Sequence, residues 1–465
     1  MSSILAGGAN IKYDLNDMST PDSNIDGVFA KNLFSAKDFS GELKKTLPGK
    51  IYRLLRKVGH IADDNNVRVY LAGGFVRDLI SGGRNFDMDI VAEGDAITFA
   101  PVLARQLKAT LQLYPRFKTA TLKLQDDLRI DLASARTEYY AHAGALPEVR
   151  LSSLRDDLCR RDFTINTLAV SLNKKFFGKL VDFFNGQKDI KDKKIKVLHD
   201  LSFIEDPTRI FRAVRLEQRL GFRIDKHTKS LLKAAVDLKM FDRLSKGRIA
   251  DELKLLLSEP SPAKVIRRME QLHKLKFLHS RIKYNRRMKN YLVSAQKILH
   301  WHKTNLPQYP IQGWLVYLLA ITDELKFRAA GEFYAGLGLK RSECRCLMSC
   351  KRYGKEAIAS LQKVKLSCPS KIYKILKPLS EEAVLFLAVK YGERNLREFF
   401  MKFLKKYAKI KLRITGDDIK KLNLRPGPEF RNILEYILWA KIDGQVKSKK
   451  DELALAGKYI SRLRN

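Results

Sequence analysis

The chain has 465 residues, 45% of them hydrophobic, which is enough for about three domains with buried cores. Its net charge is +38, and the first 200 residues contribute only +6 (31 basic, 25 acidic), whereas the remaining 265 contribute +32 (58 basic, 26 acidic). Such an excess favours a polyanionic partner, nucleic acid above all, over a merely soluble basic surface. Five cysteines argue against a disulfide framework. Without a signal peptide or a membrane-length apolar run, we expect a soluble cytoplasmic protein that does not enter a membrane.

The hydrophobic pattern changes along the chain. Residues 1–45 are polar and aperiodic, and we expect a mobile leader there. The next part alternates between helical and strand patterns: helices over 48–66, 76–80 and 96–111, and strands over 67–72, 86–94, 121–124 and 129–133. After about residue 200 the pattern is helical almost throughout, with Gly or Pro stops. The sequence therefore predicts a mixed α/β head followed by a basic, all-helical remainder.

A glycine pair stands where the first predicted strand meets a helix. Gly73 and Gly74 would let the backbone approach a phosphate, and Arg77, one turn into the helix, could clamp it. The signal is weak by itself, because a tight strand–helix turn needs glycine anyway.

Two aspartates follow at strand spacing. Asp87 and Asp89 would point to the same face of a strand, where their charges repel unless a cation lies between them. Mg²⁺ prefers such oxygen ligands, and a pair of ions could activate a hydroxyl and stabilise a leaving pyrophosphate. Two exposed aspartates at a strand edge are the alternative. Asp131, on a later predicted strand, is our candidate for a third catalytic carboxylate, with a turn-facing aspartate as its alternative.

Arginines recur every three residues on a helix predicted after residue 206. Arg209, Arg212 and Arg215 would form a ladder suited to anionic oxygens, or a solvated basic face. Asp206 and Arg209, one turn apart, could offer an acceptor and donors to a nucleobase, or form a surface salt bridge. Two other patterns are rejected: the cysteines of "CRCLMSC" lack a fourth ligand for a metal site, and the His199-Asp200 pair lacks the companion histidines of a phosphohydrolase.

These motifs together resemble a known family. "LAGGFVRDLI", "FDMDIVAEGDA", "RTEYYAHAGALPEV", "DDLCRRDFTINTLAV", "LVDFFNGQKDI" and "LHDLSFIEDPTRIFRAVRLEQRLGF" are similar, in order, to class II tRNA nucleotidyltransferases and bacterial poly(A) polymerases, of the DNA polymerase β-like superfamily. The likeness covers about residues 50–275, and "ITGDDIKKLNLRPGPEFRNILEYILWAKIDGQV" resembles the tail of the same enzymes, with Asn423 where a glycine is common. It implies a head over 46–195, a neck over 196–275, a body over 276–400 and a tail over 401–465.

The resemblance also implies roles for individual residues. Asp87 and Asp89 would hold two Mg²⁺ ions, and Asp206 with Arg209 would read the base edge. The incoming CTP or ATP would be bound by the remaining residues, which are Gly73, Gly74, Arg77, Asp78, Arg161, Asp162, Asn166, Arg212 and Arg215. Of these, Gly74 and Arg77 would lie at its phosphates. The partner would be tRNA, bound by the basic helical part and the "RPGPEF" segment.

Two subgroups and one other class remain in competition. "LYPRFKTATLKL" (113–124) and the "GPEFRNIL" tail favour a tRNA nucleotidyltransferase over a poly(A) polymerase. The choice between adding CCA, CC or A alone stays open, and the loop between Asp131 and Arg160, which contains "ALPE" (145–148), bears on it. The lack of further domains before the head slightly favours CCA or CC. A non-catalytic RNA-binding protein on a retired head is the rival, against which the intact Asp87, Asp89 and arginine ladder speak.

Overall fold

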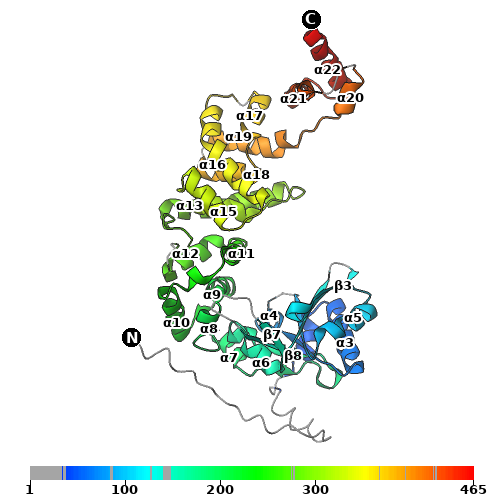
Figure 1. Cartoon of the computed structure of the whole chain (residues 1–465), viewed down its shortest axis with the longest axis vertical. Coiled ribbons are helices and arrows are strands. Elements are labelled where there is room, and N and C mark those ends of the chain that lie inside the picture. The colour runs from blue at the N-terminus through cyan, green and yellow to red at the C-terminus, as the bar shows by residue number, and fades with distance from the viewer. Residues whose placement is uncertain are drawn as a thin grey trace, which may run out of the picture. The chain divides into compact units, whose positions relative to one another are not determined.

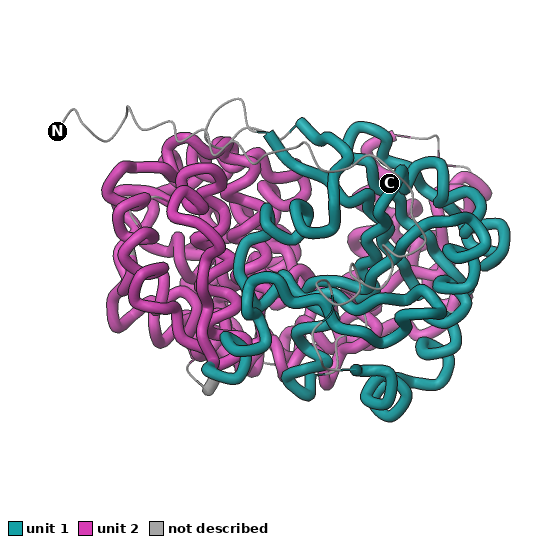
Figure 2. The backbone as a smooth tube through the Cα atoms, turned by 90° about the horizontal axis from the view of Figure 1, so that it is seen from below, with its two compact units in different colours: residues 1–139, 147–192 teal, residues 140–146, 193–465 magenta. Residues whose placement is uncertain are grey.

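The computed structural model describes residues 34, 38–83, 87–125, 128–139, 148–273, 275, 278–365, 367–392, 394–422, 424 and 427–464. Most of the expected leader, Asn423 and residues 140–147 of the predicted loop between Asp131 and Arg160 therefore lie outside the described residues. The chain forms two compact units, residues 1–139 with 147–192 and residues 140–146 with 193–465 (Figure 2). The first is α/β and the second is helical almost throughout, which confirms the predicted fold class (Figure 1). The four-part division into head, neck, body and tail stays a prediction.

The first unit is built on a seven-stranded sheet. The strand order is β3-β4-β5-β2-β1-β8-β9, and every neighbouring pair is antiparallel except β2 and β5, which are parallel. The strands are β1 (Arg68–Ala72), β2 (Met88–Glu93), β3 (Thr110–Tyr114), β4 (Thr119–Lys123), β5 (Arg129–Ser134), β8 (Ala169–Ser171) and β9 (Leu180–Val181). A separate antiparallel pair joins β6 (Arg136–Tyr139) to β7 (Glu148–Leu151).

Helices cover the apolar face of this sheet. The alternation in β2 buries Met88 and Ile90 and leaves Asp89 exposed, so one face packs in the core and the other carries polar groups. The helices of the unit are α2 (Ser40–Thr46), α3 (Gly49–Asp64), α4 (Gly74–Ile80), α5 (Ala96–Leu107), α6 (Leu154–Cys159) and α7 (Gly186–Lys191). Of these, α3 and α5 contact each other and the strands beside them (Figure 1).

The predicted strands before residue 135 all form, but some boundaries differ. The helix expected to reach residue 111 ends at Leu107, because Lys108 adopts a left-handed conformation (φ 53°), and the chain then enters the unpredicted strand β3. Strands β6 to β9 have two to four residues, too few for a period-of-two pattern to stand out. Helix α2 begins at Ser40, inside the expected leader, because Leu43 is fully buried.

The second unit is a succession of helices joined by short turns. They are α8 (Ser202–Glu205), α9 (Thr208–Leu220), α10 (Lys226–Asp237), α11 (Lys246–Leu257), α12 (Pro262–His273), α13 (Arg286–Asn305), α14 (Gly313–Ile321), α15 (Phe327–Gly336), α16 (Arg341–Leu361), α17 (Pro369–Leu376), α18 (Glu381–Lys390), α19 (Arg394–Lys405), α20 (Gly416–Lys420), α21 (Pro428–Ile442) and α22 (Lys449–Arg464). Strands β10 (Lys194–Ile195) and β11 (Arg223–Ile224) pair in parallel. Among the described residues, no helix has the length and apolar character needed to cross a bilayer.

Gly59 marks the closest approach between α3 and the sheet. A Cβ on Gly59 would lie 1.9 Å from the carbonyl oxygen of Leu172, which follows β8. Helix propensity alone predicts that Gly59→Ala stabilises by about 0.5–1 kcal/mol. We expect the clash to prevail and the free energy of unfolding to fall by roughly 1–3 kcal/mol. Gly457→Ala in α22, where nothing lies within 4 Å, should show the stabilisation instead. Denaturant unfolding of both variants checks this, and a more stable Gly59→Ala would refute the close packing.

Candidate active site

The parallel register of the sheet brings two predicted carboxylates side by side. Asp89 of β2 lies opposite Asp131 of β5. Both project from the polar face, because their strand neighbours Ile90 and Ile130 are buried. Asp87 stands just before β2, and its carbonyl oxygen accepts a hydrogen bond from the Asp89 amide at 3.2 Å. Asp89 and Asp131 thus share one face of the sheet, and the charge of Asp87 lies close enough to act on Asp89.

The electrostatics of Asp89 reflect this crowding. Although its side chain remains open to solvent on one side, the surrounding protein desolvates the carboxylate and raises its pKa. The guanidinium of Arg161 opposes this shift, while the negative charges of Asp131 and Asp87 raise the pKa further. A cation bound between these carboxylates would relieve both their repulsion and their desolvation.

Asp131 is already held by hydrogen-bond donors. Its Oδ1 accepts from Thr121 Oγ1 at 2.7 Å and from Arg129 Nε and Nη2 at 2.9 and 2.8 Å. The described residues contain no ready-made cluster of three metal-binding side chains. The carboxylate oxygens nevertheless fit a hard cation such as Mg²⁺, and Arg129 shows that this corner of the site accommodates positive charge.

The glycine turn lies against the same site. Gly73 has φ 76°, in the region that favours glycine, and it precedes Gly74, the first residue of α4. A Cβ on Gly73 would lie 2.7 Å from Nη1 of Arg161. The backbone conformation therefore favours glycine at this position, and a side chain there would also make the guanidinium of Arg161 shift.

Arg77 and its partners form a buried network behind the turn. The Arg77 side chain is 2% exposed, donating from Nη1 to Asn166 Oδ1 at 2.6 Å and from Nε to Asp78 Oδ1 at 2.7 Å. Asn166 in turn donates from Nδ2 to Asp162 Oδ1 at 2.8 Å. The structure thus brings together four residues predicted to bind nucleotide. Their nucleotide contacts stay a prediction, and the observed role of Arg77 is to hold Asn166.

The residues predicted to read the base lie in the second unit. Asp206 precedes α9, and its Oδ1 accepts from Thr208 N, Thr208 Oγ1 and Arg248 Nη2 at 3.1, 2.7 and 2.9 Å. Arg209 is 4% exposed and donates from Nη1 to Ser202 Oγ at 2.7 Å. The two side chains are therefore held by neighbours rather than by each other.

The arginine ladder is uneven. Arg212 is exposed, but Arg215 is partly buried, with Nε 2.9 Å from Glu259 Oε1 and Nη1 3.7 Å from Glu252 Oε2. The three arginines thus form neither a uniformly solvated face nor a row of equivalent hydrogen-bond donors to an anion. Their sequence spacing could not reveal the acidic partners, which come from the distant helix α11 and the turn after it.

Comparisons with known proteins place the chain. Residues 69–196 match the family described as "Poly A polymerase head domain", and residues 221–284 match "Probable RNA and SrmB- binding site of polymerase A". The A-adding tRNA nucleotidyltransferase of Geobacter sulfurreducens is 37% identical over 89% of this chain and 48% of its own length. That of Halalkalibacterium halodurans is 30% identical over 90% of this chain and 95% of its own length. This chain belongs to the tRNA nucleotidyltransferase family.

A solved structure agrees with this family over nearly the whole chain. The Thermotoga maritima CCA-adding enzyme, complexed with tRNA, is 33% identical with a TM-score of 0.66, covering 92% of this chain and 99% of that one. The resemblance inferred from the motifs is therefore confirmed. The chain spans about half the length of the Geobacter relative, and nearly all of the Halalkalibacterium relative.

Sequence reasoning missed Asp157. Its fully buried carboxylate accepts from Arg160 Nη2 at 2.6 Å and from Arg161 Nη2 at 3.0 Å. Burial would raise the pKa of Asp157, but the guanidiniums of Arg161 and Arg160 outweigh it and lower the pKa. The i,i+3 and i,i+4 spacing of one aspartate and two arginines in "DLCRR" is the sequence signal that could have predicted these two ion pairs.

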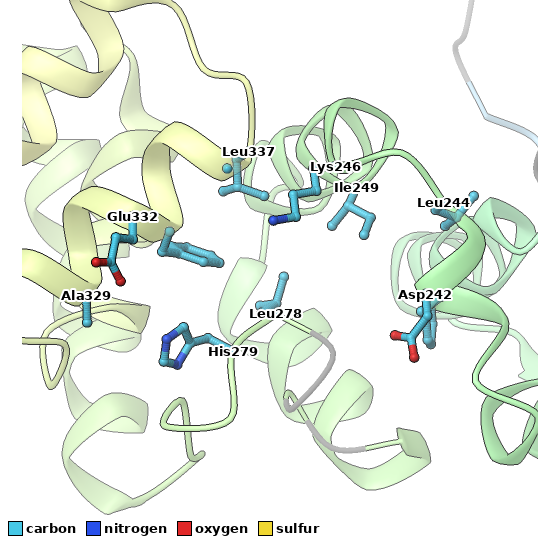
Figure 3. A pocket seen from close by; sticks show the side chains of 12 residues that line it. Asp242, Leu244, Lys246, Ile249, Leu278, His279, Ala329, Glu332 and Leu337 are labelled. Atoms are coloured by element: carbon cyan, nitrogen blue, oxygen red, sulfur yellow. The ribbon is translucent and has the colours of Figure 1, made fainter.

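The cavity in Figure 3 lies elsewhere in the chain. It has a volume of about 410 Å³ and lies among α11, α15 and the turn at residues 240–243. Apolar side chains line it together with Asp242, Lys246 and Glu332, and no residue of the predicted site is among its lining. The thiols of "CRCLMSC" also lie apart, and burial raises the pKa of Cys350 to about 12, so that thiol stays protonated.

Removing the Asp157 charge tests the support of Arg161. We expect Asp157→Asn to lower the free energy of unfolding by about 3–5 kcal/mol at neutral pH, because two guanidiniums lose their buried partner. Since the folded-state pKa is depressed, this stabilisation is present above the unfolded pKa of about 4 and is lost as pH falls through the folded pKa. The deficit of the variant should therefore shrink in acid. Urea unfolding across pH checks it, with the exposed neighbour Asp156→Asn as control; equal losses in both variants would contradict it.

Proposed function

We propose that this tRNA nucleotidyltransferase adds nucleotides from ATP, CTP or both to the 3′ end of tRNA, releasing pyrophosphate and using no nucleic-acid template. The register that sets Asp89 beside Asp131, with Asp87 adjacent, carries this proposal. A cationic cofactor and an anionic substrate would give such a face a use. The net charge of +32 beyond residue 200 supports tRNA as the polyanion. The relatives support it by their names.

Asp87 and Asp89 would hold two Mg²⁺ ions, with Asp131 as the third carboxylate, and bound Mg²⁺ would supply positive charge to the transferring phosphoryl group and the leaving pyrophosphate. Arg161, braced by Asp157 and lying against Gly73, would bind the triphosphate. Arg77, through Asn166, would fix the pocket for the sugar. Positioning and charge neutralisation account for most of the catalysis that such a site can provide.

The names of the relatives favour one member of the family over the others. Two relatives aligned over about nine-tenths of the chain are named A-adding enzymes, while the solved structure that covers 92% of it is named a CCA-adding enzyme. We expect addition of the terminal A alone, against the slight preference for CCA or CC drawn from the sequence, because the Geobacter sulfurreducens relative has the highest identity of the three, 37%. A cytoplasmic location, where tRNA matures, stays a prediction.

Three tRNA transcripts decide between these activities. They end before CCA, after the first C and after CC, and each is offered ATP, CTP or both in the presence of Mg²⁺. We expect one A to be added, and only to the transcript ending in CC, when products are resolved to the nucleotide. Completion of CCA on the shortest transcript would show a full CCA enzyme, and a stop at CC would show a CC-adding one. A long A-tail on any RNA would show a poly(A) polymerase, and no incorporation at all would favour the non-catalytic rival.

Asp89→Asn separates the role of the carboxylate in catalysis from its role in stability. Incorporation should fall at least about 100-fold, because the charge that holds the metal is lost. Without Mg²⁺, the free energy of unfolding should stay equal or rise by on the order of 1 kcal/mol, since repulsion by Asp131 and Asp87 is relieved. Asp64→Asn, an exposed position on α3, should change neither quantity. Thermal unfolding with EDTA and single-turnover assays measure both. A variant that is markedly less stable yet active would refute the assignment.

A further inference from the structure

The side chain of Asp206 is fixed from a helix that sequence reasoning left out of the site. Helix α11 packs against α9 (Figure 1). Arg248 of α11 reaches Asp206, with its Nη2 at 2.9 Å from Oδ1. Both side chains are mostly buried, 27% and 17% exposed, so solvent screens this ion pair only in part. The remaining donors to Asp206, the amide and hydroxyl of Thr208, come from its own helix start.

These contacts treat the two carboxylate oxygens differently. Within the described part of the chain, every donor to the Asp206 carboxylate converges on Oδ1. The other oxygen, Oδ2, is thereby turned in a defined direction with its acceptor capacity left over. The two Thr208 donors and Arg248 approach Oδ1 from different helices, so rotation of the carboxylate about its last torsion would break the bond across the helices as well as the helix cap. The bond from Arg248 therefore adds a restraint from outside the helix start.

Glu252 supports Arg248 from one turn further along α11. Its carboxylate lies 3.7 Å from Arg215 Nη1, and its Oε2 is buried without a hydrogen bond. Arg212, Arg215 and Arg248 all lie near enough to interact with this charge. Its negative charge offsets the positive charge that three arginines would otherwise concentrate beside Asp206. Helix α11 therefore supplies both a hydrogen bond to Asp206 and charge compensation around it.

We propose that Arg248 is a positioning residue for base selection, which it exerts by presenting Oδ2 of Asp206 to the amino group of the incoming base. This inference rests on the proposed function. Adenine and cytosine both carry an amino donor beside a ring-nitrogen acceptor, whereas guanine and uracil carry a carbonyl oxygen at the place of that amino group. A fixed carboxylate oxygen accepts from the amino group and repels the carbonyl. Loss of Arg248 frees the carboxylate and weakens this discrimination.

The test is a comparison of kcat/KM for ATP, CTP, GTP and UTP on tRNA ending in CC, using the full-length chain. Arg248→Ala should reduce the preference for the favoured nucleotide over GTP and UTP about tenfold or more, mainly through KM, because a charge-assisted hydrogen bond is lost. Arg248→Lys keeps one donor and should restore part of the preference. Should the alanine variant fail to fold, the lysine variant alone must show a smaller preference than the wild type.

Lys254→Ala is the matched control, because it removes a positive charge from the same helix at a side chain that faces Glu343 and Trp314 instead. It should leave the preference unchanged. If Arg248→Ala lowered kcat/KM equally for all four nucleotides and left the preference intact, the bond between Arg248 and Asp206 would serve stability alone. That result would overturn this inference but not the proposed function. A wild-type chain that incorporates no nucleotide would overturn the proposed function and, with it, this inference.

Discussion

Repulsion between carboxylates on one face of the sheet is the constraint on which the rest of the first unit depends. The parallel pairing of β2 with β5 fixes Asp89 against Asp131, and no change of rotamer can separate their backbones. Sheets otherwise avoid like charges at directly opposed positions, because the pair destabilises the fold. The surrounding structure answers with cations, Arg129 on Asp131 and Arg161 beside Asp89. The two opposed carboxylates therefore fit the proposal that they are kept for the cation they would bind.

The compensating arginines need partners of their own, and this requirement spreads the network outward. Arg161 is braced by Asp157, which also holds Arg160, and Arg160 reaches Glu138 with Nη1 at 2.7 Å. Each of these charged side chains can thus be partly or fully buried because an oppositely charged side chain lies against it. A guanidinium held by a buried carboxylate loses little further freedom when it meets an anion, so the network would prepare Arg161 for the phosphate contact proposed for it.

The sequence was sufficient to predict the class of fold, the succession of the main strands along the chain and the strands that carry the carboxylates. Period-of-two alternation identified β2 and β5, and the same periodicity put Asp89 and Asp131 on a polar face. It could not give their pairing, since register between distant strands depends on packing that no local pattern records. For the same reason Asp157 and Arg248 escaped notice: both act on site residues through contacts that only the folded chain creates. Short strands such as β9 leave no pattern at all.

Base selection and phosphoryl transfer draw on different kinds of restraint. The carboxylates of the first unit derive their place from strand register, which is rigid and insensitive to single side chains. Asp206 derives its orientation from one bond across two helices, together with a helix cap. Rotation of a single carboxylate is enough to change which base edge it accepts, whereas a change in the metal face would require the sheet to re-register. Selectivity should therefore vary among related chains far more readily than the chemistry.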